Sequence, residues 1–170
     1  MGFEIERKFL LDVDRLKQSG ALLTAEKYVI RQGYLSCNLN SSHDAVLPGN
    51  TVRVRMVADK AFLTIKGPAT GISRAEFEYA IPAEEAAQLL SLCIGHVINK
   101  TRYLIPVQGH VWEVDEFHGI HHGLWLAEIE LTTEQASFSK PDWLSDEVSG
   151  DPRYHNSSLA LHPLPVPPRG

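Results

Sequence analysis

The segment Glu4-Ile5-Glu6-Arg7-Lys8 alternates charged and apolar side chains close to the start of the chain. In a β-strand successive side chains point to opposite faces, so Glu4, Glu6 and Lys8 share one face. Arg7 is the one departure from the alternation. The segment therefore predicts a strand with a fully ionic face, whereas exposed strands usually mix neutral polar residues such as threonine among their charges.

The same two-residue alternation recurs along the rest of the chain. Its ionic positions are, in chain order, Arg53 and Arg55, Lys66, Glu76 and Glu78, Lys100 and Arg102, Glu113 and Asp115, and Glu128 and Glu130. Helical patterns are expected at residues 12–19 and 82–93, with shorter helical or turn pieces in 136–150. Because parallel strands need long crossovers, many strands with few helices predict an antiparallel sheet of the α+β class. Alternation alone leaves open whether the sheet closes into a barrel.

Composition and charge limit the classes of protein that fit. The chain has 170 residues, of which 44% are hydrophobic and 22% charged, as in an ordinary globular protein. We expect one domain over residues 1–161 and a proline-rich tail over 162–170. The formal net charge of −5 disfavours a nucleic-acid binder, which usually carries a basic surplus. Without a signal peptide or an apolar run of about 18 residues, the sequence predicts a cytoplasmic protein outside the membrane.

The presence of both signs on one face points to a specific chemistry. Guanidinium and ammonium groups hold polyanions, whereas clustered carboxylates hold hard divalent cations. A phosphate chain that carries Mg²⁺ needs both kinds of group. The plainer alternative is a solvent-facing sheet whose charges pair across strands. That alternative predicts that carboxylate-to-amide substitutions leave metal binding unaltered.

The ordered series of charged blocks resembles the CYTH, or triphosphate tunnel metalloenzyme, family. Glu4 to Lys8 is similar to the ExExK signature that opens these proteins. The later blocks that match in order are Ile30–Leu35, Arg53–Arg55, Thr64–Gly67, Glu76–Glu78, Lys100–Tyr103, Val114–Phe117, Glu128–Leu131 and Gly150–Asn156. The resemblance implies an eight-stranded closed antiparallel β-barrel, a tunnel with a charged interior and with helices packed outside. Val54, Ile65 and Phe77 would then face outward beneath helices and loops.

The resemblance also implies roles for the charged residues. Those expected to bind a triphosphate are Lys8, Arg53, Arg55, Lys66, Lys100, Arg102 and Arg153. Those expected to hold one or two Mg²⁺ or Mn²⁺ ions are Glu4, Glu6, Glu128, Glu130 and Asp115. Catalysis is expected to depend on Glu4, Glu6, Lys8 and Lys100. The supporting positions are Glu76, Glu78, Glu113 and Tyr28.

The function implied by the resemblance is metal-dependent hydrolysis of a triphosphate, first of all inorganic triphosphate to pyrophosphate and phosphate. The sequence offers no recognisable aromatic signature for a base or a thiazolium ring. The alternatives are a class IV-type adenylyl cyclase, a nucleoside or thiamine triphosphatase, and a domain that binds polyphosphate or nucleotide without turnover. The expected partner is a small-molecule triphosphate. The sequence leaves open the oligomeric state, homodimer included, and the role of the long stretch Cys37 to Asn50.

Overall fold

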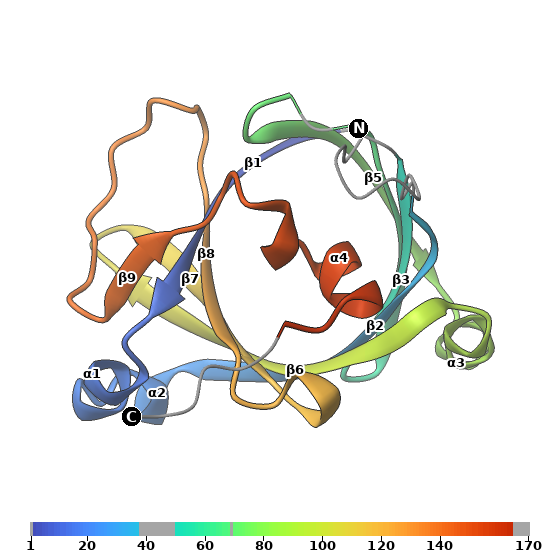
Figure 1. The fold of residues 1–170 in the computed structure, drawn as a ribbon, viewed down its shortest axis with the longest axis horizontal. Helices are drawn as coiled ribbons and strands as arrows, with labels where there is room; N and C mark the ends of the chain where they lie inside the picture. Colours follow the sequence, from blue (N-terminus) through green and yellow to red (C-terminus); the bar gives the residue numbers. More distant parts are fainter. Residues whose placement is uncertain (1, 38–49, 69, 165–170) are drawn as a thin grey trace.

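The fold was analysed in a computed structural model that describes residues 2–37, 50–68 and 70–164 (Figure 1). The strands are β1 Gly2–Leu11, β2 Glu26–Cys37, β3 Thr51–Val57, β4 Lys60–Lys66, β5 Ser73–Ile81, β6 Ile94–Val107, β7 His110–Phe117, β8 Trp125–Glu130 and β9 Leu144–Glu147. The helices are α1 Val13–Gln18, α2 Ala21–Thr24, α3 Ala83–Ser91 and α4 Asn156–Leu161, with 3₁₀ turns at Gly119–His121 and Pro152–Tyr154. None of the helices in the described part of the chain is long and apolar enough to cross a bilayer.

Eight of the strands form a closed antiparallel barrel. Around the ring the order is β5-β4-β3-β2-β6-β7-β8-β1, and β1 pairs with β5 to close it. Within the ring strand β1 therefore has two partners, since Glu4 lies opposite Arg74 of β5 and Lys8 lies opposite Glu128 of β8. The ring is visible end-on in Figure 1. The predicted eight-stranded antiparallel barrel of the α+β class is confirmed.

The shorter elements agree with the sequence in two places and differ in one. Asp12 caps α1 by accepting a hydrogen bond from the backbone N–H of Arg15 at 3.1 Å, and α3 begins directly after Pro82. The prediction of only short turns or helices in 136–150 is wrong for β9, which is a strand. Leu144 and Glu147 pair with the end of β1 outside the barrel. The long stretch after Cys37 and the final prolines fall largely outside the described residues.

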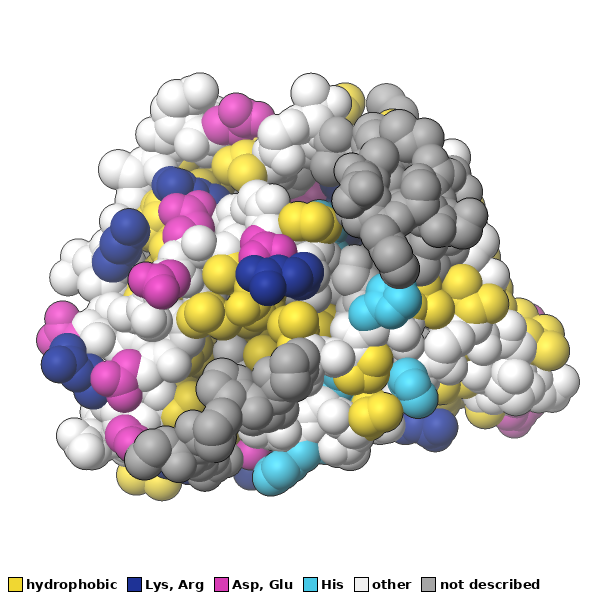
Figure 2. All heavy atoms as spheres, viewed as in Figure 1, with side chains coloured by type: hydrophobic (Ala, Val, Ile, Leu, Met, Phe, Trp, Pro, Cys, Tyr) yellow, Lys and Arg dark blue, Asp and Glu magenta, His cyan; other side chains and the backbone are white. Residues whose placement is uncertain are grey.

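One end of the barrel interior is an apolar core rather than a charged tunnel. The inward side chains Ile98, Phe117 and Leu126 are at most 1% exposed and pack against Leu159 and Ala160 of α4. Helix α4 thus lies inside the ring (Figure 1), and atoms fill the centre of the ring in the space-filling view (Figure 2). The prediction of a charged interior therefore holds for only part of the barrel, because the alternating charges give way to apolar residues at this end.

Two further cores lie outside the barrel wall. Strands β1, β7 and β8 present Phe9, Trp112 and Ile129 outward, and these pack with Leu16 of α1 and with Trp143. Helix α3 packs on the barrel wall to form the second core, whose buried members are Val54, Ala61, Ala86 and Leu90. The outward apolar side of the barrel is therefore covered over β1, β7 and β8 and beneath α3, and this packing holds the strands that carry the charged inner face.

Candidate functional site

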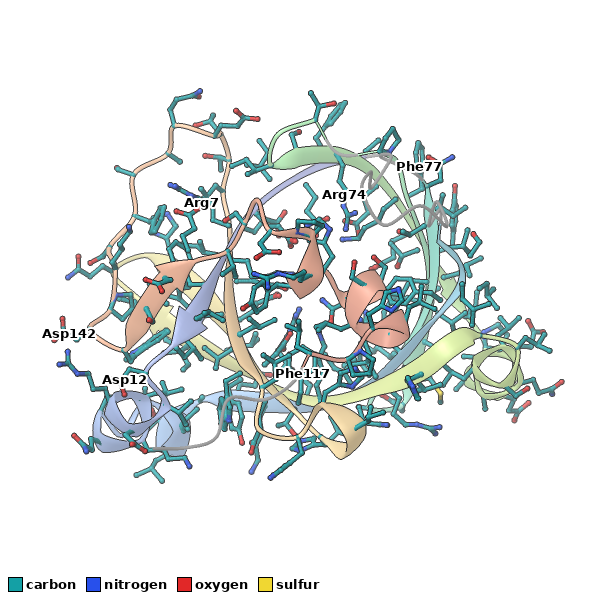
Figure 3. The ribbon with its side chains drawn as sticks, viewed as in Figure 1. Arg7, Asp12, Arg74, Phe77, Phe117 and Asp142 are labelled. Atoms are coloured by element: carbon teal, nitrogen blue, oxygen red, sulfur yellow. The ribbon has the colours of Figure 1, made fainter. Side chains whose placement is uncertain are left out.

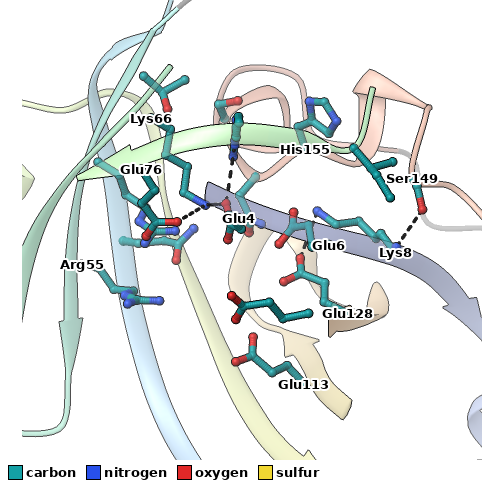
Figure 4. Close-up of a pocket in the computed structure, with 18 of the residues that line it drawn as sticks. Glu4, Glu6, Lys8, Arg55, Lys66, Glu76, Glu113, Glu128, Ser149 and His155 are labelled. Carbon is teal, nitrogen blue, oxygen red and sulfur yellow. Dashed lines mark hydrogen bonds and ion pairs between the residues drawn. The ribbon is translucent and has the colours of Figure 1, made fainter. Parts of the chain in front are cut away.

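A charged cavity of about 620 Å³ occupies the remaining part of the barrel interior. Its basic lining residues are Lys8, Arg53, Arg55, Lys66, Arg74, Lys100 and Arg102. Its acidic lining residues are Glu4, Glu6, Glu76, Glu78, Glu113, Glu128 and Glu130. They come from β1 and β3 to β8, as the close-up in Figure 4 shows for a subset. The barrel thus brings together seven cations and seven anions that are far apart in the sequence.

One side of the cavity, formed by β6, β7 and β8, consists of buried, closely paired charges, and we call it the paired wall. Lys100 Nζ lies 2.7 Å from Asp115, and both side chains are at most 2% exposed. Arg102 donates to both oxygens of Asp115, through Nε at 2.7 Å and Nη2 at 2.8 Å. On the neighbouring strand Glu128 pairs with Lys8 at 3.0 Å and with Arg102 at 3.3 Å. Each buried charge on this wall therefore has a partner at contact distance.

The pKa shifts on the paired wall follow from this pairing. Burial alone would raise the pKa of Asp115, but Arg102 and Lys100 hold it below its usual range. Burial is likewise overcome at Glu128, where Lys8 and Arg102 hold the pKa well below its usual range. Burial lowers the pKa of Lys100 to about 8, and Arg102, which shares Asp115 with it, acts in the same direction. Asp115 and Glu128 therefore stay ionised.

The opposite side, formed by β3, β4 and β5, is paired much less completely, and we call it the open wall. Arg53 and Arg55 share a single carboxylate, that of Glu78, at 3.7 and 3.2 Å. Glu78 is itself 34% exposed and also accepts a hydrogen bond from Thr64 at 3.0 Å. The Nε atoms of both arginines are buried without a hydrogen-bond partner among the described residues. Burial and the neighbouring Arg53 lower the pKa of Arg55 more than Glu78 raises it.

Strand β1 joins the two walls and contributes carboxylates to the cavity. Glu4 forms an ion pair with Lys66 and lies 3.6 Å from Arg74. Glu6 is in none of the ion pairs formed among the described residues, and burial together with the nearby Glu128 raises its pKa to about 7. Figure 4 shows Glu4, Glu6 and Glu128 directed into the same space. An added cation would therefore find an uncompensated carboxylate between the walls.

The carboxylate oxygens suit a hard divalent cation in chemistry, although they are not yet arranged around one. Within residues 2–37, 50–68 and 70–164, no group of three or more potential donor residues is already converged as a metal site. Glu4 and Glu128 instead face the ammonium groups of Lys66 and Lys8. Oxygen donors of this kind are those preferred by Mg²⁺ and Mn²⁺. The donor set fits a divalent cation on the condition that these carboxylates turn away from their lysine partners.

Three residues singled out from the sequence do not line the cavity. Asp115 lies behind Lys100 and Arg102 and is 1% exposed. Arg153 is 67% exposed and forms its ion pair with Asp151. Tyr28 lies opposite Arg102 in the sheet but outside the set of lining residues, and its hydroxyl donates to Glu26. The remaining site residues predicted from the sequence all line the cavity.

The sequence interpretation missed Arg74, and it assigned no role to two other polar side chains of the cavity. Arg74 points into the barrel (Figure 3) and precedes Glu76 by two positions, so the same alternation could have found it. His155 and Ser149 reach the cavity from the C-terminal segment, and the Ser149 hydroxyl accepts a hydrogen bond from the Lys8 backbone N–H at 2.9 Å. Burial and Lys8 lower the pKa of His155 to about 4, so its imidazole is neutral near pH 7. His155 and Ser149 lie outside the alternating strand segments, so the sequence pattern could not have placed them in the cavity.

Known proteins resemble this chain over nearly its whole length. The family model for the CYTH domain matches residues 2–159. An inorganic triphosphatase of Acetivibrio thermocellus is 48% identical over 164 residues, which are 96% of this chain and 96% of that protein. An inorganic triphosphatase of Nitrosomonas europaea is 35% identical over 162 residues, which are 93% of this chain and 97% of that protein. The crystal structure of an inorganic triphosphatase matches with a TM-score of 0.63 at 31% identity, covering 95% of this chain and 96% of that one.

Proposed function

This chain belongs to the CYTH domain family, and from that premise we propose that it is a metal-dependent inorganic triphosphatase. The reaction is hydrolysis of inorganic triphosphate to pyrophosphate and phosphate. Relatives at 48% and 35% identity that carry this name support the substrate. We also propose that the enzyme is cytoplasmic, that its substrate is a small molecule and that its metal is Mg²⁺ or Mn²⁺.

The observation that carries the proposal is the incomplete pairing of the open wall. Arg53 and Arg55 each keep a buried Nε without a partner among the described residues. A buried, unpartnered cationic donor is costly unless an anion arrives to satisfy it. Guanidinium groups bind phosphoryl oxygens through paired N–H groups, so two adjacent arginines suit a chain of phosphates. In this proposal the open wall binds the triphosphate.

The charge balance of the cavity supports a requirement for metal. With seven basic and seven acidic lining residues, the empty cavity is close to neutral. A triphosphate alone would add several negative charges next to Glu4, Glu6 and Glu128. Glu4, Glu6, Glu128 and Glu130 are the carboxylates we propose as metal ligands, while Asp115 serves Lys100 and Arg102 instead. A divalent cation held there would neutralise phosphoryl oxygens and make the phosphorus more susceptible to attack by water.

The chain's own residues then position the substrate for an in-line reaction. Lys8 and Lys100 lie at the deepest part of the cavity, where their side chains are 5% and 2% exposed. We assign them to the phosphate that enters furthest, with Lys66 and Arg102 beside it. Phosphoryl transfer depends mainly on positioning and on neutralising charge, which these fixed ammonium and guanidinium groups supply. Glu76, Glu78 and Glu113 orient the basic residues in this scheme.

Phosphate release from the purified protein tests the proposal. Inorganic triphosphate and ATP are compared with Mg²⁺, with Mn²⁺ and with excess chelator, and the ATP reactions are also assayed for cyclic AMP. Metal-dependent phosphate release that is fast from triphosphate and slow from ATP is the expected result. Glu4→Gln should lose most turnover, whereas Arg153→Ala should keep the wild-type KM because its side chain lies outside the cavity.

Each other outcome of this assay points to a different function. Cyclic AMP would indicate a cyclase, and a preference for ATP would indicate a nucleoside triphosphatase. Tight binding of triphosphate without release, in every metal, would indicate a binding domain and would contradict the proposed hydrolysis.

A further inference from the structure

Arg7 interrupts an apolar row on the outer side of β1. Its neighbours on that side, Ile5 and Phe9, both belong to the outer core around Trp112. Arg7 lies outside the ring, on the side of β9 (Figure 3), and its guanidinium is 5.3 Å from the centre of the Phe138 ring. A methionine or leucine at this position would extend the core. Packing alone therefore does not account for the positive charge.

The guanidinium forms a two-pronged ion pair with Glu147 at the end of β9, and we call this pair the outer fork. Arg7 Nε donates to Oε1 at 2.8 Å and Nη2 donates to Oε2 at 2.9 Å. Burial would raise the pKa of Glu147, but the hydrogen bonds from Arg7 and Ser149 hold it below its usual range. Because both prongs must be aligned at once, the outer fork fixes the direction of the carboxylate as well as its charge.

The barrel wall has a gap beside β1. On the edge of β1 that faces away from β8, residues 2–5 pair with β5 and residues 9–11 pair with β9. Within the described part of the chain, residues 6–8 have no strand beside them on that edge. The segment 148–156 occupies this place on its way from β9 outside the ring to α4 inside it (Figure 1). The stretch left open by the strands includes Lys8, one of the cations of the cavity.

The segment 148–156 is attached to the backbone of Lys8. The Val148 N–H donates to the Lys8 carbonyl at 2.8 Å, and the Lys8 N–H donates to the Ser149 hydroxyl at 2.9 Å. The Ser149 hydroxyl in turn donates to Glu147 Oε1 at 2.7 Å. A continuous chain of hydrogen bonds thus runs from the outer fork, through Ser149, to the strand that carries Lys8 into the cavity.

The same segment also touches both lysines at the deep end of the cavity. The Lys8 ammonium donates to the Tyr154 carbonyl at 3.2 Å, and the Lys100 ammonium donates to Asn156 Oδ1 at 3.3 Å. Between these two contacts His155 lines the cavity beside Lys8 (Figure 4). The position of the segment therefore bears on both ammonium groups that we assign to the innermost phosphate.

We propose that Arg7 and Glu147 are positioning residues, which hold the segment 148–156 in the gap and thereby fix the ammonium groups of Lys8 and Lys100. This inference rests on the proposed triphosphatase function, because it concerns the placing of the innermost phosphate. The outer fork lies outside the cavity lining, so it aligns charged groups without supplying one. Alignment of charges that act on the reacting phosphate should appear in kcat more than in KM.

Amide hydrogen exchange followed by NMR tests the link in the absence of substrate. The wild type is compared with Arg7→Met and Glu147→Gln. Methionine keeps an apolar contact with Phe138 and removes the charge. The amides of Lys8 and Val148 should exchange about tenfold faster in both variants, whereas those of β6 and β7 should keep their wild-type rates. Unchanged rates, or equally faster exchange at every amide, would overturn the inference, since the second result indicates a general loss of stability.

Steady-state hydrolysis of inorganic triphosphate measures the consequence for turnover. The kcat of Arg7→Met and Glu147→Gln should fall about ten- to a hundredfold, with KM within about threefold of the wild type. Arg7→Lys keeps the charge but not the two-pronged geometry, so its kcat should lie between those of the wild type and Arg7→Met. Arg15→Met is the matched control, because Arg15 forms an exposed ion pair with Asp12 and lies outside the cavity lining.

The control and the parent protein separate the possible failures. Wild-type kcat in both variants of the outer fork, or an equal loss in Arg15→Met, would overturn the inference. A wild-type protein that hydrolyses no triphosphate would contradict the proposed function alone. The exchange rates of the Lys8 and Val148 amides would then still show whether the outer fork holds Lys8 in place.

Discussion

The two walls of the cavity carry the same types of charged residue but pair them to different extents. On the paired wall Lys100 and Arg102 each lie 2.7 to 2.8 Å from the buried carboxylate of Asp115. On the open wall Arg53 and Arg55 share one partly exposed carboxylate and keep unpartnered nitrogens. Charge composition alone therefore does not identify a binding surface. What distinguishes the walls is whether the cations are already satisfied by the protein or still need an anion.

The largest expected effect comes from breaking the paired wall at its centre. Asp115→Asn leaves Lys100 and Arg102 buried without their main carboxylate, so the free energy of unfolding should fall by about 3 to 5 kcal/mol. Urea denaturation measures this loss. Glu113→Gln is the matched control, because Glu113 also pairs with Arg102 but is 40% exposed, and about 1 kcal/mol or less is expected. Equal losses in the two variants would mean that burial does not set the strength of this wall.

A smaller effect is expected at Glu6, on the strand between the walls. Its pKa in the folded protein is about 7, compared with 4.5 as the ordinary value, so the folded state holds a proton that the unfolded chain releases. The associated stability is present in full below pH 4.5 and is lost as the pH rises to 7, by up to about 3 kcal/mol. With chelator present, Glu6→Gln should therefore gain stability relative to the wild type between pH 5 and pH 8. If the free energies of unfolding of the wild type and Glu6→Gln differ by the same amount at every pH in this range, the raised pKa of Glu6 is contradicted.

Substitutions on the open wall should weaken substrate binding rather than reduce the stability of the fold. Arg55→Met removes a guanidinium whose buried Nε has no hydrogen-bond partner among the described residues, so KM for inorganic triphosphate should rise about ten- to a hundredfold. The free energy of unfolding should stay the same or increase. Arg31→Met, on the exposed outer side of β2, should leave KM unchanged. A variant Arg55→Met that unfolds easily and binds normally would erase the distinction between the walls.

The smallest effect concerns how the open wall is organised. Thr64 is fully buried, donates to Glu78 at 3.0 Å and accepts from Arg53 at 3.2 Å. Thr64→Val keeps the shape and removes both hydrogen bonds, so the free energy of unfolding should fall by about 1 kcal/mol. Steady-state kinetics should show a smaller rise in KM than Arg55→Met gives. A larger rise would mean that the Thr64 hydroxyl contacts the substrate itself.

Much of the barrel was predictable because alternation is a local property. Glu4, Glu6 and Lys8 follow a period of two, and that period alone places their side chains on one face. The same reasoning extends to Arg74, which the sequence analysis left out although it stands two positions before Glu76. Closure of the ring came from the family resemblance, since no single strand carries information about its distant neighbours.

The pairing of charges was not predictable, because it depends on strand register and depth. Asp115 was expected to hold metal, yet it lies beneath Lys100 and Arg102 because it faces Leu126 at the boundary of the apolar core. Glu113, two residues earlier on the same strand, is 40% exposed. The two acids look equivalent in the sequence. Only the position of the apolar core along the barrel axis separates them.

That core has a kinetic consequence. Because α4 and the apolar side chains around it fill one end of the ring, a molecule that enters the cavity cannot continue through the barrel and leave on the far side. The hydrolysed fragments must return toward the partly exposed Glu78 and Glu113, past Arg53 and Arg55, which we propose bind the intact triphosphate. Pyrophosphate retains much of the negative charge through which the proposed arginine contacts would bind the triphosphate. Release of the longer product, competing with arrival of the next substrate, is thus where turnover is expected to slow.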